Sequence, residues 1–214
     1  MPPLTPANAL IRSQNVTASE VAALMPCGHP YITPADIYDR IALGEESKDS
    51  QAMRIGSALE DSVLRFAQSE IGFEAVPNDK TLVHPWARLA ATPDAWLLSR
   101  WPSALQMENA LIEVKVSGRA ELWQDIPPHV DWQCRAQMAV TNRDVVYIVV
   151  LVAMRLLSFP VYRAPDQETE LLDRVQRFWA DHIEAGVRPS ESAPAAIQTF
   201  SFEADTPQRE AITP

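Results

Sequence analysis

The most constraining feature of this chain is an almost continuous apolar run over residues 144–152, DVVYIVVLV. A strand that is apolar at consecutive positions must be covered on both faces, as in the middle of a sheet packed between helices. No charge-free apolar run reaches the roughly 18 residues of a membrane span. The run therefore predicts a buried central strand in a layered α/β or α+β domain.

Hydrophobic periodicity and stop signals predict the surrounding elements. Helices are expected over 17–25, 33–43, 49–71, 131–141 and 166–187, with a further helical segment at 119–125. Strand character occurs at 73–76, 80–84, 88–92, 94–98, 110–117 and 155–163, the last an edge strand because it contains Pro160. The order predicts a central mixed β-sheet flanked by helices.

The 214 residues suffice for one sizeable core. Three prolines and little periodicity predict a flexible arm over residues 1–9, and four prolines predict a flexible tail over 188–214. Residues 10–187 are expected to form a single domain.

The formal net charge of −10 argues against a nucleic-acid partner, because phosphate binding leaves a basic footprint. Acidic groups gathered around bound cations, or a local basic groove, would answer that objection. The two cysteines, Cys27 and Cys134, follow no metal spacing, and neither do the four histidines. Free thiols are favoured over a disulfide, and the N-terminus lacks a secretory pattern, so a cytoplasmic protein is expected.

The segment ALIEVKVS (110–117) carries the most specific chemistry. Glu113 and Lys115 are two residues apart on a predicted strand and therefore project from the same face. Charged groups between apolar residues are costly to bury without partners, and a cation with a phosphate would supply them. Asp94 opens a strand that can pair with this one, so Asp94 and Glu113 would converge on one Mg²⁺. Lys115 would then orient an attacking water or stabilise the developing charge.

Other interpretations of these acidic residues remain open. Glu113 and Lys115 could be an exposed ion pair on a strand, since Glu-x-Lys is common. Glu60 lies among small and apolar neighbours on the predicted 49–71 helix, so it is either a metal or water ligand or a member of a salt bridge.

Four ordered blocks resemble the lambda-exonuclease-like, YqaJ-type branch of the PD-(D/E)xK nucleases, over roughly residues 10–187. They are VTASEVAALM, MRIGSALEDSV, LAATPDAWL with LIEVKV, and DWQCRAQMAVT. Phe178-Trp179 in the last helix and the following Pro189 also fit. The resemblance implies a restriction-endonuclease-like core.

The resemblance also implies roles for individual residues. Asp94, Glu113 and the carbonyl of Val114 would hold Mg²⁺, which Mn²⁺ could replace. Lys115 would be the catalytic lysine, and Glu60 would contact the metal directly or through water.

In the family, an Arg and a Ser near the N-terminus bind a terminal 5′-phosphate, and these positions fall on Arg12 and Ser19. An arginine and a hydroxyl at a helix N-terminus suit a phosphate monoester. The alternatives are a helix cap for Ser19 and a solvated arm for Arg12.

This chain departs from the family pattern at Ala95, where Gly is usual, and at Val116, where Cys is frequent. In the glutamine-rich helix, Gln133 occupies the first position of the family's Q-x-Q and is expected to be catalytic. Arg135 stands at the second position, so either Arg135 or Gln137 would take that role. Arg135, Gln137 and Arg54 are possible DNA contacts.

The implied activity is Mg²⁺-dependent 5′-to-3′ degradation of one strand of linear double-stranded DNA, giving 3′ overhangs for phage-type recombination. The implied partners are DNA ends and a single-strand annealing protein, and the implied assembly is a ring trimer. A ring retains DNA by topology, which reconciles the activity with an acidic surface. The alternatives are an endonuclease of the same fold and a non-catalytic DNA-binding module.

Overall fold

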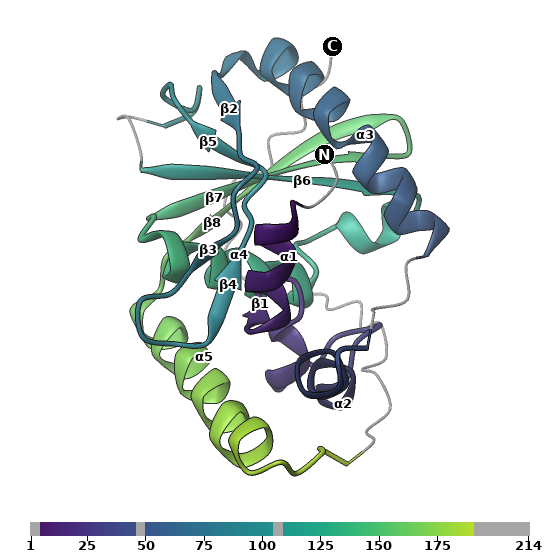
Figure 1. Ribbon diagram of the computed structural model, residues 1–214. Coiled ribbons are helices and arrows are strands. Elements are labelled where there is room, and N and C mark those ends of the chain that lie inside the picture. The colour runs from purple at the N-terminus through teal and green to yellow at the C-terminus, as the bar shows by residue number, and fades with distance from the viewer. Residues whose placement is uncertain (1–4, 46–49, 105–108, 191–214) are drawn as a thin grey trace.

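A five-stranded mixed sheet forms the centre of the molecule (Figure 1). The computed structural model describes residues 5–45, 50–104 and 109–190. The strand order is β2 (Ala75–Pro77), β5 (Ala95–Leu97), β6 (Ala110–Ser117), β7 (Val145–Val152) and β8 (Arg155–Tyr162). Strands β6 and β7 are parallel, and the other neighbours are antiparallel.

Strand β7 is the apolar run, and its prediction as a central buried strand is confirmed. Val145, Tyr147 and Val149 pack in a cluster with residues of helix α3 (Gln51–Ala67). Val146, Ile148 and Val150 instead pack with residues of helix α4 (Pro128–Thr141). The two helices therefore cover opposite faces of the sheet, and β8, which contains Pro160, is the predicted edge strand.

A second, three-stranded sheet has the order β1 (Val16–Thr17), β4 (Leu89–Ala91) and β3 (Leu82–Val83). Strand β1 runs parallel to β4, with Thr17 opposite Ala90. Beyond Ala91, the chain turns through Thr92 and Pro93 to Asp94 and enters β5. One short segment therefore links the two sheets.

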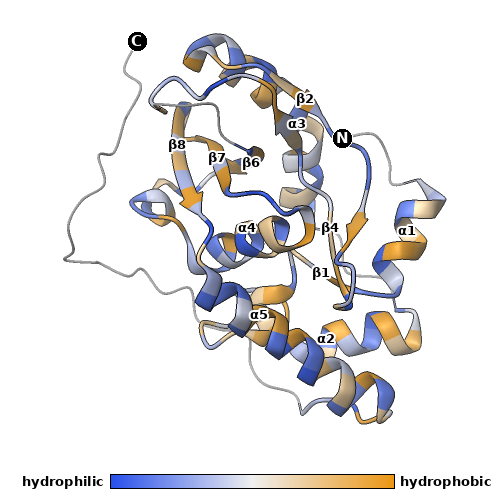
Figure 2. Ribbon diagram, turned by 90° about the vertical axis from the view of Figure 1, so that its left-hand side faces the viewer, coloured by the Kyte–Doolittle hydropathy of each residue, from blue (hydrophilic) through white to orange (hydrophobic). Residues whose placement is uncertain are grey.

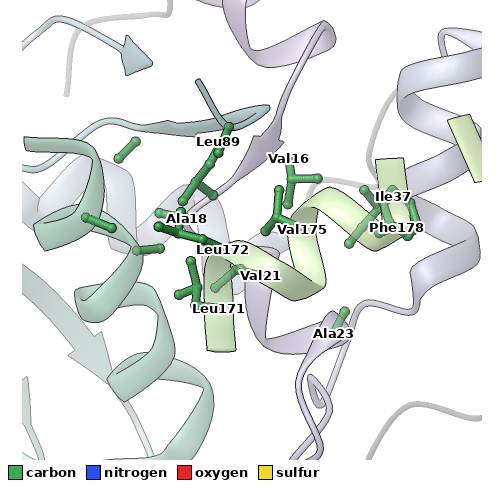
Figure 3. Packing of buried hydrophobic residues seen from close by; sticks show 14 of the residues in the cluster. Val16, Ala18, Val21, Ala23, Ile37, Leu89, Leu171, Leu172, Val175 and Phe178 are labelled. Carbon is green, nitrogen blue, oxygen red and sulfur yellow. The ribbon is translucent and has the colours of Figure 1, made fainter. Parts of the chain in front are cut away.

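The N-terminal elements pack against α5 (Pro165–Phe178), as Figure 3 shows. Val16, Val21 and Ile37 meet Leu171, Leu172, Val175 and Phe178 in one cluster. Figure 2 shows hydrophilic and hydrophobic residues alternating along α5, which is typical of a helix with one buried face. This cluster attaches the N-terminal region to α4 and α5.

Helix starts differ from expectation in two places. Helix α1 (Pro6–Ser13) overlaps the arm predicted over residues 1–9, because Thr5 caps it and Pro6 occupies the first turn, where proline is favourable. Helix α4 begins at Pro128, before the predicted start at 131; it has a proline in its first turn like α1, but no side-chain cap. The helical segment predicted at 119–125 is a short 3₁₀ helix, Ala120–Trp123.

The prediction of a helix over 17–25 is wrong. Thr17 belongs to β1, and only a 3₁₀ helix, Val21–Leu24, follows. Pairing with β4 holds the start of this segment extended, and the Glu20 carboxylate accepts the backbone N–H of Thr17 at 3.0 Å.

The helix predicted over 33–43 is confirmed. Helix α2 (Pro34–Tyr38) continues as a π-helical turn, Asp39–Leu43, and ends at Gly44, whose φ of 71° suits glycine.

Helix α3 is capped by Ser50 and continues through a π-helical turn, Gln68–Gly72, to the stop predicted at Gly72. Only its C-terminal half is buried, through Val63, Leu64 and Ala67, while Ile55 and Phe66 are about half exposed.

Residues 1–4 of the predicted arm and 191–214 of the predicted tail lie outside the described residues. Helices in the described ranges are all too short or too polar to cross a membrane.

Candidate active site

Strand β6 carries the two charged residues at the centre of the site. Its alternation is as predicted: Leu111 packs on the α4 side of the sheet, while Ile112 and Val114 pack on the α3 side. Glu113 therefore points toward α4 and is only 2% exposed. The Lys115 ammonium donates to Glu113 Oε1 at 2.6 Å, so the two side chains form an ion pair on one face.

Helix α4 completes the shell around Glu113. Gln133 donates to Glu113 Oε1 at 2.6 Å and accepts from the Lys115 ammonium at 3.0 Å. Gln137, one turn later, donates to Glu113 Oε2 at 2.6 Å. Both carboxylate oxygens are thereby fixed, and Gln137 Oε1 is buried without a hydrogen-bond partner.

Asp94 reaches the same place from the turn between β4 and β5. Strand β5 pairs antiparallel with β6, as predicted, and the backbone N–H of Val114 donates to Asp94 Oδ2 at 2.6 Å. The turn is held by Asn78, whose side chain donates to the Pro93 carbonyl at 2.9 Å and whose N–H donates to the Asp94 carbonyl at 2.9 Å. The Asp94 carboxyl is therefore positioned by backbone as well as by strand pairing.

Glu60, on α3, lies near enough to Asp94 and Glu113 for both carboxyl groups to influence its pKa. Burial, with the charges of Glu113 and Glu60, raises the pKa of Asp94 well above its usual value. Burial also raises the pKa of Glu60, and the charge of Glu113 adds to this effect. Three carboxyl groups thus crowd one place with more negative charge than their neighbours neutralise.

Lys115 is the cation of this cluster. Burial alone would lower its pKa, but the charges of Glu113 and Asp94 and the hydrogen bond to Glu113 together raise it above the usual value. The side chain therefore stays protonated at neutral pH and donates hydrogen bonds, so it is suited to stabilise negative charge rather than to abstract a proton.

The donor set fits a hard divalent cation. Glu60, Asp94 and Glu113 offer carboxylate oxygens, and the backbone of Val114 adds a carbonyl, the ligand types that Mg²⁺ prefers. The raised pKa values of Asp94 and Glu60 express a repulsion that a cation would relieve. Over the described ranges, no three His, Cys, Asp or Glu side chains are already arranged as a metal site. Glu113 is turned toward Lys115, Gln133 and Gln137 instead.

A second charged cluster lies around Glu20 in the N-terminal region. Arg40 donates to Glu20 Oε1 and Oε2, each at 2.7 Å, and to the carbonyls of Arg12 and Asn15. Burial lowers the pKa of Arg12, the nearby charge of Glu20 opposes this, and the charge of Arg40 adds to it. Arg12 thus lies within electrostatic range of this pair.

Ser19 lies beside this cluster. Its hydroxyl is 3.1 Å from that of Thr17, which in turn donates to Glu20 at 2.7 Å. Arg12 and Ser19 are both partly exposed, so an anion could reach them.

The remaining predicted contacts lie elsewhere. Arg135 points away from Glu113: it forms an ion pair with Asp131 at 2.6 Å and donates to the Tyr162 carbonyl at 3.4 Å. Of the two candidates for the second glutamine position, only Gln137 contacts Glu113. Arg54 is exposed near the start of α3.

Sequence reasoning missed Asn78 and the pair His29 and His129. Asn78 is 8% exposed although it lies in a polar stretch, PND, which resembled an ordinary turn. The two histidines are a hundred residues apart in the chain and show no shared motif, yet their rings are 5.2 Å apart. Cys27 and Cys134 are free, as expected.

Comparison with known proteins gives a consistent result. The family model of the YqaJ-like viral recombinase domain matches residues 9–144. The fold is similar to an alkaline exonuclease from Laribacter hongkongensis (TM-score 0.69, 23% identity, 86% of this chain and 94% of that chain). The same exonuclease in complex with dAMP gives a TM-score of 0.67 at 22% identity, covering 84% and 92% of the two chains.

A phage related exonuclease from Haemophilus somnus 129PT gives a TM-score of 0.62 at 12% identity, over 80% of this chain and 96% of that chain. No curated protein matches the sequence significantly. At these identities the structural likeness speaks for the fold, and the predicted fold class is confirmed.

Proposed function

Because the chain belongs to the YqaJ-like viral recombinase family, it is a deoxyribonuclease, and we propose that it degrades linear double-stranded DNA from the 5′ end with Mg²⁺. The membership confirms the resemblance found in the four sequence blocks. The observation that carries the proposal is the convergence of Asp94, Glu113 and Lys115, each from a different position on paired strands, beside Glu60.

In the proposed reaction, Asp94, Glu113 and the Val114 carbonyl would hold Mg²⁺, and Glu60 would contact the metal or its water. The bound cation would polarise the scissile phosphate and lower the pKa of a water nucleophile, and Mn²⁺ would substitute. Lys115, which stays protonated, donates to the oxygen on which negative charge develops. Removal of either the carboxylates or the ammonium is expected to abolish cleavage.

Gln133 and Gln137 act on Glu113 rather than on the phosphate. Each donates to one oxygen of the carboxylate, at 2.6 Å, and so restricts its rotation. Gln133 also accepts from Lys115 and therefore couples the lysine to the carboxylate. We assign Gln137 the role that the resemblance gave to the position of Arg135.

End recognition is assigned to Arg12 and Ser19. Strand β1 runs parallel to β4, with Thr17 opposite Ala90, and the Ala18 N–H donates to the Ala90 carbonyl at 2.8 Å. Both strands therefore run toward the same end of the small sheet, where Ser19 follows β1 and Asp94 follows β4. A 5′-phosphate held by Arg12 and Ser19 would thus lie on the side of the molecule that leads to Asp94.

The wider role is proposed as phage-type recombination in the cytoplasm. Degradation of one strand exposes a 3′ overhang, and a single-strand annealing protein would coat it. A ring trimer would hold DNA by topology, which suits a chain of formal net charge −10. With a closed ring, the protein would need no basic surface to retain DNA nonspecifically.

The test is digestion of three substrates in Mg²⁺: 5′-phosphorylated linear duplex, 5′-hydroxyl linear duplex and covalently closed circles. The proposal expects mononucleotides from the 5′ end, a preference for the phosphorylated duplex and no cutting of circles. Ser19→Ala and Arg12→Ala should reduce that preference about tenfold or more, since each removes a charge-assisted contact. Cutting of circles would instead identify an endonuclease of this fold.

Matched controls separate end recognition from folding. Ser13→Ala removes a hydroxyl that donates to the Leu10 carbonyl on exposed helix α1, so it should leave the preference unchanged. If Ser13→Ala and Ser19→Ala behave alike, Ser19 has no special role in phosphate binding.

A further inference from the structure

Three aromatic rings form a row beside the candidate active site. His29 meets His129 edge-on, with ring centroids 5.2 Å apart and an interplanar angle of 77°. His29 also meets Tyr31 edge-on, with centroids 5.9 Å apart and an angle of 69°. The rings come from two different segments, the loop before α2 and the first turn of α4.

The inner end of the row adjoins the proposed catalytic residues. His129 precedes Gln133 by four residues on α4, so the two side chains share one face of the helix. Gln133 contacts both Lys115 and Glu113. The charge of Lys115 also acts on both histidines, which places both imidazoles within its electrostatic range.

The outer end of the row is open to solvent. Tyr31 is 67% exposed, whereas His29 is only 7% exposed. The Tyr31 N–H donates to His29 Nδ1 at 3.1 Å, which fixes both the ring orientation and the neutral tautomer with hydrogen on Nε2. Tyr31 is thus held against the buried ring of His29 while most of its own surface stays in solvent.

The two histidines are also uncharged at neutral pH. Burial, with the charge of Lys115, lowers the pKa of His29 to about 4. Burial, the neighbouring His29 and Lys115 together lower the pKa of His129 to about 4. The exposed ring of Tyr31 is therefore backed by neutral imidazoles, a setting that suits the face of a base better than it suits a phosphate.

We propose that His129, His29 and Tyr31 form a stacking platform for an unpaired nucleobase next to the scissile phosphate. This inference rests on the proposed exonuclease function, since a strand separated from its complement presents such a base. Tyr31 supplies the stacking face, and His29 positions Tyr31. His129 contacts His29 and lies one turn of α4 before Gln133, which contacts Lys115. Base-to-aromatic stacking tolerates any sequence, as a nuclease without sequence preference requires.

The test uses 5′-phosphorylated duplexes in EDTA, so that no cleavage occurs. One set carries 2-aminopurine at the first or the second nucleotide of the 5′ end, and a second set carries it at the 3′ end. Stacking on the row should quench the fluorescence on binding of the wild-type chain. Tyr31→Phe should retain the quenching, and Tyr31→Ala should lose it. Tyr162→Ala is the matched control, because Tyr162 is 58% exposed on β8, opposite Val145, whereas Lys115 pairs with Val150.

A second arm measures cleavage in Mg²⁺. Replacing the stacked base by an abasic residue should raise KM of the wild-type chain about fivefold or more, the lower end of what one stacked base contributes. Tyr31→Ala should show the higher KM on the normal duplex and no further rise on the abasic one. His29→Ala should act in the same direction, with unchanged kcat in both variants.

The outcomes are separable. If the wild-type chain releases 5′ nucleotides but quenching and KM are the same in Tyr31→Ala and Tyr162→Ala, the platform is wrong and the exonuclease function stands. If Tyr31-dependent quenching occurs only with 2-aminopurine at the 3′ end, the proposed polarity is wrong while the platform is supported.

Discussion

Two buried charge clusters in this protein are unbalanced in opposite directions. Around Glu113, three carboxyl groups, including those of Glu60 and Asp94, face the single ammonium of Lys115. Around Glu20, one carboxylate faces the guanidinium of Arg40, with that of Arg12 nearby. Both central carboxylates are almost fully buried, at 2% for Glu113 and 8% for Glu20.

The sign of each imbalance indicates the ion that would complete the cluster. Excess carboxylate beside a protonated lysine calls for a cation, and a surplus guanidinium beside a hydroxyl calls for an anion. Under the proposed function, a DNA end with its metal would supply both at once. Strand β1 leads to the Glu20 cluster, and its partner β4 leads through a short turn to Asp94. The pairing of β1 with β4 therefore sets the distance between the two clusters.

The sharpest way to break this comparison is to remove a charged group from the carboxylate cluster. Lys115→Ala and Asp94→Asn should each lower kcat by about 10³-fold, because each removes a group that acts only on the developing charge or its metal. Release of acid-soluble nucleotides from linear duplex measures this. Lys80→Ala, which removes an exposed lysine between β2 and β3, is the control and should cleave normally.

The corresponding change in the cluster around Glu20 removes the guanidinium of Arg40. Arg40→Ala leaves Glu20 buried without its partner and also frees the carbonyls of Arg12 and Asn15. We expect the free energy of unfolding to fall by about 3 kcal/mol, as for other broken buried pairs, measured by urea denaturation. Arg177→Ala should cost far less, because its pair with Asp173 is exposed. An equal loss of unfolding free energy in Arg40→Ala and Arg177→Ala would show that Arg40 contributes no more than an ordinary surface residue.

The two clusters also differ in how much of them the sequence could predict. Glu113 and Lys115 were predictable because a strand has a fixed period of two, and Asp94 because it opens the neighbouring strand. The Glu20–Arg40 pair was not, since it joins residues twenty apart across a segment whose helix prediction failed. Local capping signals at Thr17 resemble those of a helix, and only pairing with β4 decides otherwise.

Long-range contacts explain the other misses. The choice of Gln137 over Arg135 depends on which face of α4 meets β6, and the first helical turn, at Pro128, sets that face. His29 and His129 meet only because the loop before α2 is folded back onto α4. The central position of β7 and the edge position of β8, by contrast, followed from one apolar run and one proline, because few arrangements bury a strand on both faces.

Mg²⁺ offers a smaller and more selective probe. If the carboxylate cluster binds the cation, a Mg²⁺ concentration ten times its Kd should stabilise the wild-type chain by about 1.4 kcal/mol, seen as a higher Tm. Asp94→Asn should lose most of that increase, and Arg40→Ala should keep it. A Tm that rises equally in Asp94→Asn would place the cation elsewhere.

The pH dependence of stability without metal tests the same imbalance. The pKa of Asp94 is raised in the folded state, so the folded chain holds its proton at pH values where the unfolded chain has lost it. Stability contributed by this group is therefore present below about pH 4, its unfolded pKa, and is lost as pH rises toward the folded pKa. Asp94→Asn lacks that loss, and its amide can still accept from the Val114 N–H.

The wild-type chain should thus become less stable than Asp94→Asn as pH rises from 4 to 8 in EDTA, by urea denaturation. A wild-type chain that gains stability over Asp94→Asn with rising pH would mean that the carboxylates are already neutralised.

The smallest effect is expected at Arg135, which lies on α4 between the two glutamines yet belongs to neither cluster. Its guanidinium pairs with Asp131 one turn back, with side chains 14% and 26% exposed, and stacks 5.9 Å from the Trp132 ring. Arg135→Ala should therefore cost about 0.5 kcal/mol in urea denaturation, typical of a pair four residues apart on a helix, and should change kcat less than twofold. Gln133→Ala, on the face that meets Glu113, is the matched contrast and should lower kcat at least tenfold with a similar change in stability. If Arg135→Ala lowers kcat as much as Gln133→Ala does, the arginine enters the site when DNA binds, and the assignment of Gln137 to the second glutamine role fails.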